Sequence, residues 1–241
     1  MINIMIPASG SSVQFASEYW PKNCVEICEK PMIQYVIENF ESVKNKKFIA
    51  ILSEEECTKF HTDNMVKLFT DDNAEIIRLT GSTGGALCTG LMAVEYIDND
   101  DELLISNNDQ KFDCDIEEVL KKFRKDKVDC GVVTFECVHP RWSYIRLEGK
   151  NVVEAAEKRP ISKQAIAGLY YFKHGKDFVE AAKNTILKGK DHEGVFYISA
   201  SINEMILKNK KVGHVEISPK LYHTFYEPKQ IEKYELEMRN A

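Results

Sequence analysis

The hydrophobic positions in the first half of the chain form short apolar runs that alternate with stretches of helical periodicity. The apolar runs, which are typical of buried strands, cover residues 2–7, 47–53, 74–80 and 102–109. Residues 31–43 instead place apolar side chains three and four positions apart, which predicts a helix with Pro31 at its first position. A second helix is expected over residues 84–97, capped by Ser82 or Thr83. Strands that alternate with helices predict crossover connections and a largely parallel sheet.

The second half of the chain has a mixed pattern. A helical segment at 115–126 leads into an apolar strand at 129–138, and alternation around Glu148-Gly149-Lys150 predicts a hairpin with a tight turn. Another strand is expected at 164–175, followed by helices at 177–187 and 199–209. Because neither a linker nor a repeat divides the chain, we expect one α/β domain over residues 1–241 with a small second lobe.

Composition narrows the class of protein. The chain has 241 residues, 44% of them hydrophobic, which is enough for a sizeable core. A net charge of −6 argues against general affinity for nucleic acid or anionic membranes, since both need a basic face. No run approaches 18 apolar residues, and the apolar start lacks a basic leader, so neither secretion nor membrane spanning is expected. The seven cysteines form no C-x-x-C pair and are interpreted as reduced thiols of a cytoplasmic protein.

The stretch MIPASGSSVQF, residues 5–15, resembles a strand that feeds a phosphate-binding turn. Gly10 lacks a side chain and allows close approach of a phosphate, although an ordinary turn between strand and helix explains it equally well. Lys22 follows a proline that stiffens its backbone, which suits a lysine held over a phosphate; a plain surface lysine is the alternative. The chain has no G-x-x-x-x-G-K-[ST] motif, so ATPase chemistry of that type is disfavoured.

Two further polar groups follow predicted strands. Asp109 ends an apolar run inside a polar cluster with Asn107 and Asn108, which favours a metal-binding carboxylate over a turn cap. Glu157 and Lys158 end a later strand, where Lys158 can bind a second anion; a solvated pair is the alternative, and Arg159 is an adjacent cation.

Gly168 interrupts the strand expected at 164–175. Such a glycine indicates either a bulge or close approach of a ligand to the backbone.

Taken in order, these segments resemble the sugar-1-phosphate nucleotidyltransferases, the nucleotide-sugar pyrophosphorylases. The segments that carry the resemblance are INIMIPASGSSVQF, WPK, EKPMIQYVIENF, GSTGGALCTGL, DELLISNNDQKFDCDI, WSYIRLE, VVEAAEKRPIS and AIAGLYYF. The likeness covers residues 2–235 and is strongest to members encoded with bacterial capsule and surface-polysaccharide genes. It implies a Rossmann-like, GT-A-type fold: a mixed, mainly parallel sheet flanked by helices, with a small substrate-binding lobe.

The resemblance also implies a reaction and a set of roles. The reaction joins an NTP and a small phosphorylated substrate to give a nucleotide-activated product and pyrophosphate. Residues 1–126 would form the nucleotide-binding half and residues 127–241 the substrate-binding half. The implied nucleotide-binding residues are Ala8, Ser9, Gly10, Ser11, Thr83, Gly85 and Asn108. Lys22 would stabilise charge at the α-phosphate, Asp109 would hold Mg²⁺, and Lys158 would bind the substrate phosphate beside Glu157 and Gly168.

The sequence departs from the family pattern at two functional positions. The family loop reads G-x-G-x-R, and Gln14 stands where the arginine contacts the triphosphate, so this catalytic position carries no charge. Thr224 stands where the family often has a second metal-binding aspartate, with Glu227 close by as a substitute. Two alternatives to an active enzyme follow: a nucleotide-binding protein with impaired turnover, and a GT-A glycosyltransferase. The segments WPK and EKPMI favour the nucleotidyltransferase. A homo-oligomer is compatible with the sequence.

Overall fold

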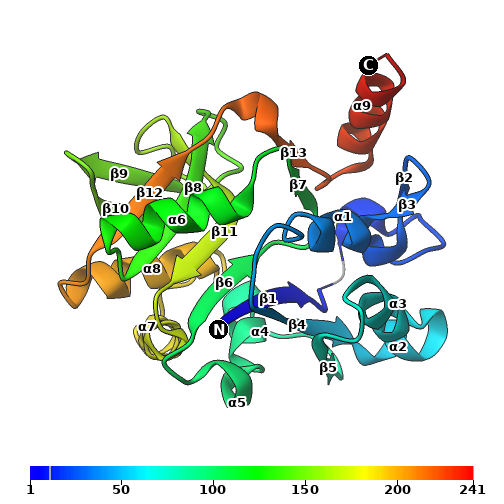
Figure 1. The fold of residues 1–241 in the computed structure, drawn as a ribbon, viewed down its shortest axis with the longest axis horizontal. Helices are drawn as coiled ribbons and strands as arrows, with labels where there is room; N and C mark the ends of the chain where they lie inside the picture. The colour runs from blue at the N-terminus through cyan, green and yellow to red at the C-terminus, as the bar shows by residue number, and fades with distance from the viewer. Residues whose placement is uncertain (11, 241) are drawn as a thin grey trace.

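A nine-stranded mixed sheet forms the centre of the molecule in the computed structural model, which describes residues 1–10 and 12–240 (Figure 1). Its strands are β1 (Ile2–Ala8), β4 (Lys46–Ser53), β5 (Ala74–Leu79), β6 (Glu102–Ser106), β8 (Cys130–Glu136), β9 (Tyr144–Glu148), β10 (Asn151–Ala156), β11 (Gln164–Phe172) and β12 (Val212–Glu216). The order is β10-β9-β11-β6-β1-β4-β5, and β8 pairs with both β11 and β12.

The two halves of the chain contribute different kinds of pairing to this sheet. Strands β6, β1, β4 and β5 are all parallel, and the inner three are continuous apolar runs because they are covered on both faces. In the second half, β11 runs antiparallel to β6, β8 and β9, and Gly149 at φ +61° turns the chain from β9 into β10. The expected α/β fold with a mixed sheet, and the hairpin in it, are confirmed.

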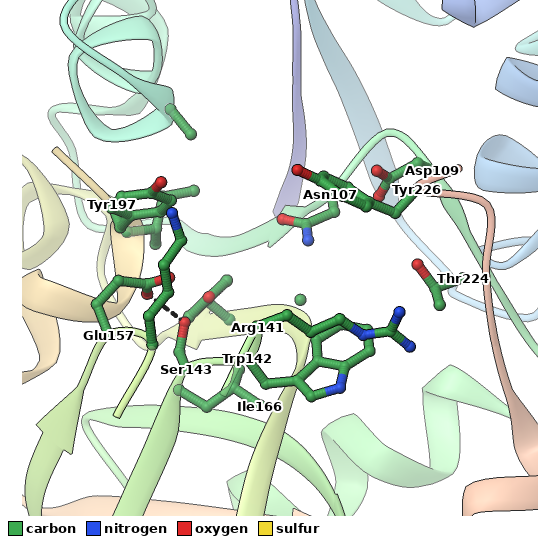
Figure 2. A pocket seen from close by; sticks show the side chains of 15 residues that line it. Asn107, Asp109, Arg141, Trp142, Ser143, Glu157, Ile166, Tyr197, Thr224 and Tyr226 are labelled. Atoms are coloured by element: carbon green, nitrogen blue, oxygen red, sulfur yellow. Dashed lines mark hydrogen bonds between the residues drawn. The ribbon is translucent and has the colours of Figure 1, made fainter. Parts of the chain in front are cut away.

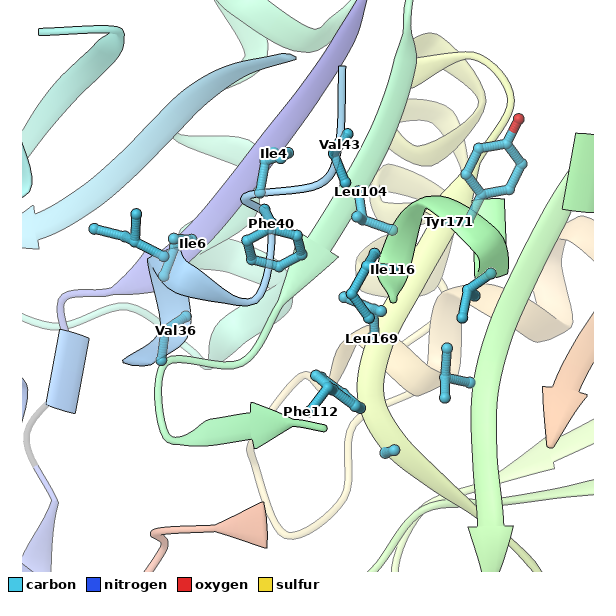
Figure 3. Close-up of a cluster of buried hydrophobic side chains, with 14 of the residues drawn as sticks. Ile4, Ile6, Val36, Phe40, Val43, Leu104, Phe112, Ile116, Leu169 and Tyr171 are labelled. Atoms are coloured by element: carbon cyan, nitrogen blue, oxygen red, sulfur yellow. The ribbon is translucent and has the colours of Figure 1, made fainter. Parts of the chain in front are cut away.

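Helices cover both faces of the sheet. On one face lie α1 (Met32–Glu38), α2 (Glu54–Phe60), α3 (Thr62–Phe69) and α6 (Ile116–Asp126), which share a core with β1 and β11. Figure 3 shows this core, where Phe40, Leu104 and Leu169 pack together. On the other face lie α4 (Ala86–Leu91), α5 (Val94–Ile97), α7 (Gly175–Leu187) and α8 (Ile198–Leu207). Successive side chains of each strand thus enter opposite cores.

A third hydrophobic cluster joins the N-terminal loop to the C-terminal segment. The loop contains η1 (Val13–Phe15), η2 (Lys22–Cys24) and the hairpin β2 (Glu26–Ile27) and β3 (Lys30–Pro31); the C-terminal segment contains β12, η3 (Pro219–Leu221), β13 (Tyr222–Thr224) and α9 (Pro228–Arg239). Strand β13 pairs with β7 (Gln110–Phe112), directly after Asp109. Phe15, Tyr35, Phe225 and Tyr234 are buried together, so α9 packs over the loop that follows β1.

Three local expectations about helix ends are wrong. Pro31 precedes α1 as its N-cap because it still pairs with Glu26 in the small hairpin, and the helix ends at Glu38. Neither Ser82 nor Thr83 caps α4: Gly85 is the N-cap at φ +122°, and the Thr83 hydroxyl donates to its carbonyl. The segment at 84–97 forms two short helices, α4 and α5.

Among the described residues, no helix combines the length and apolar character needed to cross a bilayer.

Candidate active site

The carboxyl ends of β1 and β6 meet at one edge of the sheet. The two strands are parallel neighbours, so the residues after Ala8 lie beside Asn107, Asn108 and Asp109. Asn23, which the sequence did not single out, ties the two segments together: its buried amide donates to the Ala8 carbonyl at 2.9 Å and accepts from Asn108 at 2.9 Å. Asn108 therefore holds the framework at this edge.

Lys22 and Asp109, 87 positions apart in the chain, form an ion pair at this edge. Lys22 Nζ lies 2.6 Å from Asp109 Oδ2, and the two side chains are only 10% and 11% exposed. The Lys22 ammonium also lies 5.9 Å from the centre of the Tyr226 ring. The fold thus brings together the two residues that the resemblance implies for charge stabilisation and metal binding.

A pocket of about 240 Å³ opens beside Asp109 (Figure 2). One end, called here the loop end, is lined by Asp109, Thr224 and Tyr226. The opposite end, called the far end, is lined by Glu157, Lys158 and Tyr197. The structure therefore places Asp109, Glu157, Lys158 and Gly168, four of the residues expected at a site, around one cavity.

The far end contains a fixed carboxylate beside a cation. Glu157 Oε2 accepts hydrogen bonds from the hydroxyls of Ser143 and, at 2.7 Å, Ser199. The Lys158 ammonium lies 5.1 Å from the centre of the Tyr197 ring, and a hydrogen bond to Tyr197 raises the pKa of Lys158. Lys158 is thus a charged group with a defined position.

Gly168 lines the pocket and contacts the segment that contains Asn107 and Gln110. It lies at φ +61° in a bulge of β11, and a Cβ atom there would lie 2.4 Å from Asn107 Nδ2 and 2.5 Å from Gln110 Oε1. Its carbonyl accepts from the Asn107 backbone and the Gln110 side chain, both at 2.9 Å. The bulge is confirmed, and the groups that closely approach this backbone are side chains of the chain itself.

The loop after β1 is held by neutral hydrogen bonds. Ala8 is buried, and Ser9 and Gly10 follow it at the strand end; Ser11 lies outside the described residues. The Gln14 amide donates to the Tyr226 hydroxyl at 3.1 Å and accepts from Ser12 at 3.0 Å. Gln14 is therefore linked to the pocket through Tyr226.

Thr83 and Gly85 do not line the pocket, although Ala86 does. The space where a side chain at position 85 would lie is occupied by the chain itself: a Cβ atom on Gly85 would lie 2.5 Å from the Phe196 carbonyl oxygen. The fold itself therefore requires glycine at this position.

Several pocket residues were not singled out as site residues in the sequence. Arg141, Trp142 and Ser143 lie in the loop between β8 and β9, and Tyr197 precedes α8. They are separated along the chain from the nucleotide-loop and metal-binding motifs described above. Of these residues, Trp142 and Ser143 fall in WSYIRLE, one of the segments that carry the resemblance.

A family model described as nucleotidyl transferase matches residues 10–214. The chain belongs to the nucleotidyl transferase family. The chain is also 28% identical over 219 residues to the bifunctional protein GlmU of Methanocaldococcus jannaschii, covering 87% of this chain and 48% of that protein. It therefore spans about half the length of this curated relative.

Solved structures of similar proteins have the same fold. A nucleoside-diphosphate-sugar pyrophosphorylase from Vibrio cholerae superimposes with a TM-score of 0.84 at 22% identity, covering 97% of this chain and 99% of that chain. A UDP-glucose pyrophosphorylase complexed with UDP-glucose gives a TM-score of 0.80 at 16% identity, covering 100% and 99%. The nucleotidyl transferase fold implied by the resemblance is confirmed.

The donor set of this nucleotidyl transferase suits a divalent cation that is shared with a ligand. Among the described residues, no three His, Cys, Asp or Glu side chains gather as a complete metal site. Asp109 supplies one carboxylate in the pocket, and Asn107 and Thr224 supply neutral oxygens. Mg²⁺ commonly binds through one or two carboxylates while phosphates and water complete its coordination. These residues therefore fit Mg²⁺ that arrives with a nucleotide.

Proposed function

We propose that the protein transfers NMP from an NTP to a sugar 1-phosphate or a related small phosphorylated compound and releases pyrophosphate. The observation that carries this proposal is the Lys22–Asp109 pair, which borders a pocket whose far end presents Lys158 and a fixed Glu157. Family membership and the shared fold support it. Two anionic reactants need positive charge at two places, and Lys22 beside Asp109 and Lys158 at the far end lie at two separate places.

The nucleotide is assigned to the edge formed by β1 and β6. Backbone N–H groups at Ser9 and Gly10 would face its phosphates, since no side chain crowds Gly10. A nucleotide-binding role of Ser11 stays a proposal that rests on the sequence. Thr83 and Gly85 would border the base through the start of α4, and Asn108 would keep the edge in place through Asn23. On this proposal residues 1–126 form the nucleotide-binding half and residues 127–241 the substrate-binding half.

The phosphorylated substrate is assigned to the far end of the pocket. Lys158 would bind its phosphate, and the free oxygen of Glu157 would accept a hydrogen bond from a hydroxyl or amino group. Gly168 would lie beneath the substrate as part of the pocket floor.

The chemistry is an in-line displacement at the α-phosphorus. An oxygen of the substrate phosphate forms a new bond to that phosphorus while the bond to the bridging oxygen of the β-phosphate breaks, and pyrophosphate leaves with the electron pair. Lys22 would exchange its bond to Asp109 for the α-phosphate and stabilise charge there. Mg²⁺, when bound at Asp109, would neutralise phosphate charge.

One observation favours a second candidate, a nucleotide-binding protein with impaired turnover. Gln14 is neutral, and both ends of its amide already have partners. We propose the active enzyme as the better interpretation because Lys22, Asp109 and Lys158 remain in place. A cytoplasmic location, a role in surface-polysaccharide precursor synthesis and homo-oligomer formation stay proposals that rest on the sequence.

The test is one matrix of reactions. Five NTPs are each combined with several sugar 1-phosphates and other small phosphates in the presence of MgCl₂, and pyrophosphate release is measured. Thermal stabilisation by each NTP is recorded in parallel. Release with at least one pair supports the enzyme. Stabilisation by NTPs without release from any pair would instead identify a binding protein.

A further inference from the structure

The loop end of the pocket has little positive charge of its own. From Pro7 to Pro21 the chain contains no lysine or arginine, and Glu18 adds a negative charge. Lys22, the next cation along the chain, already lies 2.6 Å from Asp109. A triphosphate carries several negative charges, so a cation from another part of the chain is needed at this end.

Arg141 is the cation that borders the loop end from outside the loop. It lines the same pocket as Asp109, and in Figure 2 its guanidinium is directed toward Thr224, away from Glu157 and Tyr197. Lys158, the other cation of the pocket lining, lies at the far end beside Tyr197. The two cations thus serve opposite ends of the cavity.

The surroundings of Arg141 hold it in place while leaving its donors available. Its guanidinium stacks 4.8 Å from the centre of the Trp142 ring, which in turn packs against Phe135 and Tyr222. Its ion pair with Glu227 is long, at 3.8 Å. Within the described residues the guanidinium makes no hydrogen bond, so its N–H groups can bind an anion. A stacked, planar guanidinium is well suited to phosphate because two of its donors can bind two oxygens at once.

We propose that Arg141 is a catalytic residue that binds the triphosphate of the NTP and stabilises the departing pyrophosphate. The inference rests on the proposed function. When the bond between the α-phosphorus and the bridging oxygen breaks, the electron pair remains on the pyrophosphate, and negative charge grows there. Arg141 donates hydrogen bonds to these oxygens and supplies the charge that Gln14 does not.

The first experiment measures binding without turnover. Inorganic pyrophosphate with MgCl₂ is titrated by calorimetry into the parent protein, into Arg141→Gln and into Arg146→Gln. Arg146 is the matched control because its ion pairs are with Glu148 and Glu154 on the β9–β10 hairpin, outside the pocket. Arg141→Gln is expected to weaken pyrophosphate binding about tenfold or more, since a charged hydrogen bond is lost. Arg146→Gln is expected to bind like the parent.

The second experiment measures turnover. Arg141→Gln is expected to lower kcat about 10²-fold, with the KM for the phosphorylated substrate within about twofold of the parent. Arg141→Lys keeps the positive charge but loses the paired donors of the guanidinium, and its kcat is expected to lie between those of the parent and Arg141→Gln. Adding Gln14→Arg to Arg141→Gln returns a cation to the loop and is expected to recover about tenfold in kcat.

Different results would overturn the proposal. Unchanged pyrophosphate affinity in folded Arg141→Gln and Arg141→Lys, or an effect confined to the KM for the phosphorylated substrate, would remove Arg141 from the triphosphate. If the double variant with Gln14→Arg were no more active than Arg141→Gln, Arg141 would not be supplying the charge that Gln14 lacks. If the parent protein itself binds neither NTP nor pyrophosphate, the proposed function fails, which is a separate result.

Discussion

The two ends of the pocket differ in how their polar groups are held. Neutral side chains form the hydrogen bonds beside the loop end, namely those of Gln14, Tyr226 and Asn23. Its charged residues Lys22 and Asp109 pair with each other. At the far end, Lys158 and Glu157 are charged, and each is positioned by uncharged neighbours: a ring beside the cation and hydroxyls beside the carboxylate.

This difference shows that neutral side chains hold the pocket residues in place, while a few charged side chains are left to bind ligands. At the loop end, Lys22 and Asp109 neutralise each other within a hydrogen-bonded framework, and Arg141 borders this end from the loop between β8 and β9. The far end has a cation, Lys158, that makes no close ion pair with the described part of the chain and is positioned beside the Tyr197 ring. A ligand at the loop end must therefore break the Lys22–Asp109 pair, whereas one at the far end meets a site that is already formed.

The largest effect is expected from the loop end when its carboxylate is neutralised. Asp109→Asn removes the charge that would hold Mg²⁺, and we expect pyrophosphate release to fall about 10³-fold or more. The asparagine still offers Lys22 an oxygen, so circular dichroism is expected to show an intact fold. Asp113→Asn, which lies outside the pocket beside His223 and Lys111, is the control and is expected to keep activity. Retained activity in Asp109→Asn would refute the metal role.

The close contact of Gly168, in the pocket lining, with Asn107 and Gln110 is tested by Gly168→Ala. The added methyl group meets Asn107 and Gln110 at a left-handed backbone angle, and we expect the free energy of unfolding in urea to fall by about 3 kcal/mol. Gly149→Ala is a matched control, because Gly149 has the same φ of +61° and a methyl group added there would have no atom within 4 Å. It is expected to lose only about 1 kcal/mol. Equal losses would show that the close contacts do not matter.

The far end alone is tested by Lys158→Ala. Losing a charged hydrogen bond to a phosphate is expected to raise the KM for the phosphorylated substrate about 10- to 100-fold, with a much smaller change in the KM for the NTP. Arg159→Ala, which removes a neighbouring exposed cation paired with Glu154, is expected to change neither. Equal effects of Lys158→Ala on both constants would place Lys158 outside the substrate site.

A smaller effect is expected when the bond between the N-terminal loop and the C-terminal segment is removed. Tyr226→Phe takes away the acceptor for the Gln14 amide, and we expect the KM for the NTP to rise about threefold to fivefold, because one neutral hydrogen bond is lost. Tyr19→Phe alters an exposed tyrosine of the same loop and is expected to have no effect. An unchanged KM in Tyr226→Phe would show that Gln14 does not order the nucleotide site.

The smallest effect is expected from Glu56, which accepts a hydrogen bond from Asn23. Burial raises the pKa of Glu56, more than the hydrogen bond from Asn23 lowers it. The folded state therefore favours the protonated carboxyl, and the stability contributed by Glu56 falls as pH rises above its ordinary value of 4.5. Glu56→Gln keeps an acceptor for Asn23 and is expected to be more stable at pH 7 by up to about 1 kcal/mol, reduced by solvent screening. Urea unfolding at pH 4 and pH 7 checks this, since a gain that is equal at both pH values would contradict the titration.

Sequence periodicity sufficed for the architecture because the strands of the central sheet are long enough to show their own pattern. The four parallel strands and the β9–β10 hairpin lie where apolar runs and a glycine turn predicted them. The ends of α1 and α4 could not be predicted, since Pro31 and Gly85 are fixed by a small hairpin and by the Phe196 backbone.

For the site, ordered motifs located residues that follow strands but not those that reach the pocket from loops. Asp109, Lys158 and Gly168 were found because each follows or interrupts an apolar run. Arg141 and Tyr226 were not found, because a loop residue faces the pocket only through tertiary packing.

The packing of α9 and Phe225 against Phe15 has a consequence for how the gene can change. The loop that follows β1 is supported by side chains encoded more than 200 codons downstream. A loop grafted from a relative, even one that restores an arginine at position 14, would lose the partner that Gln14 finds in Tyr226. Substitutions in the loop after β1 and in the C-terminal segment are therefore expected to be accepted in pairs, and transplants that exchange both segments together should succeed where exchanges of the loop alone fail.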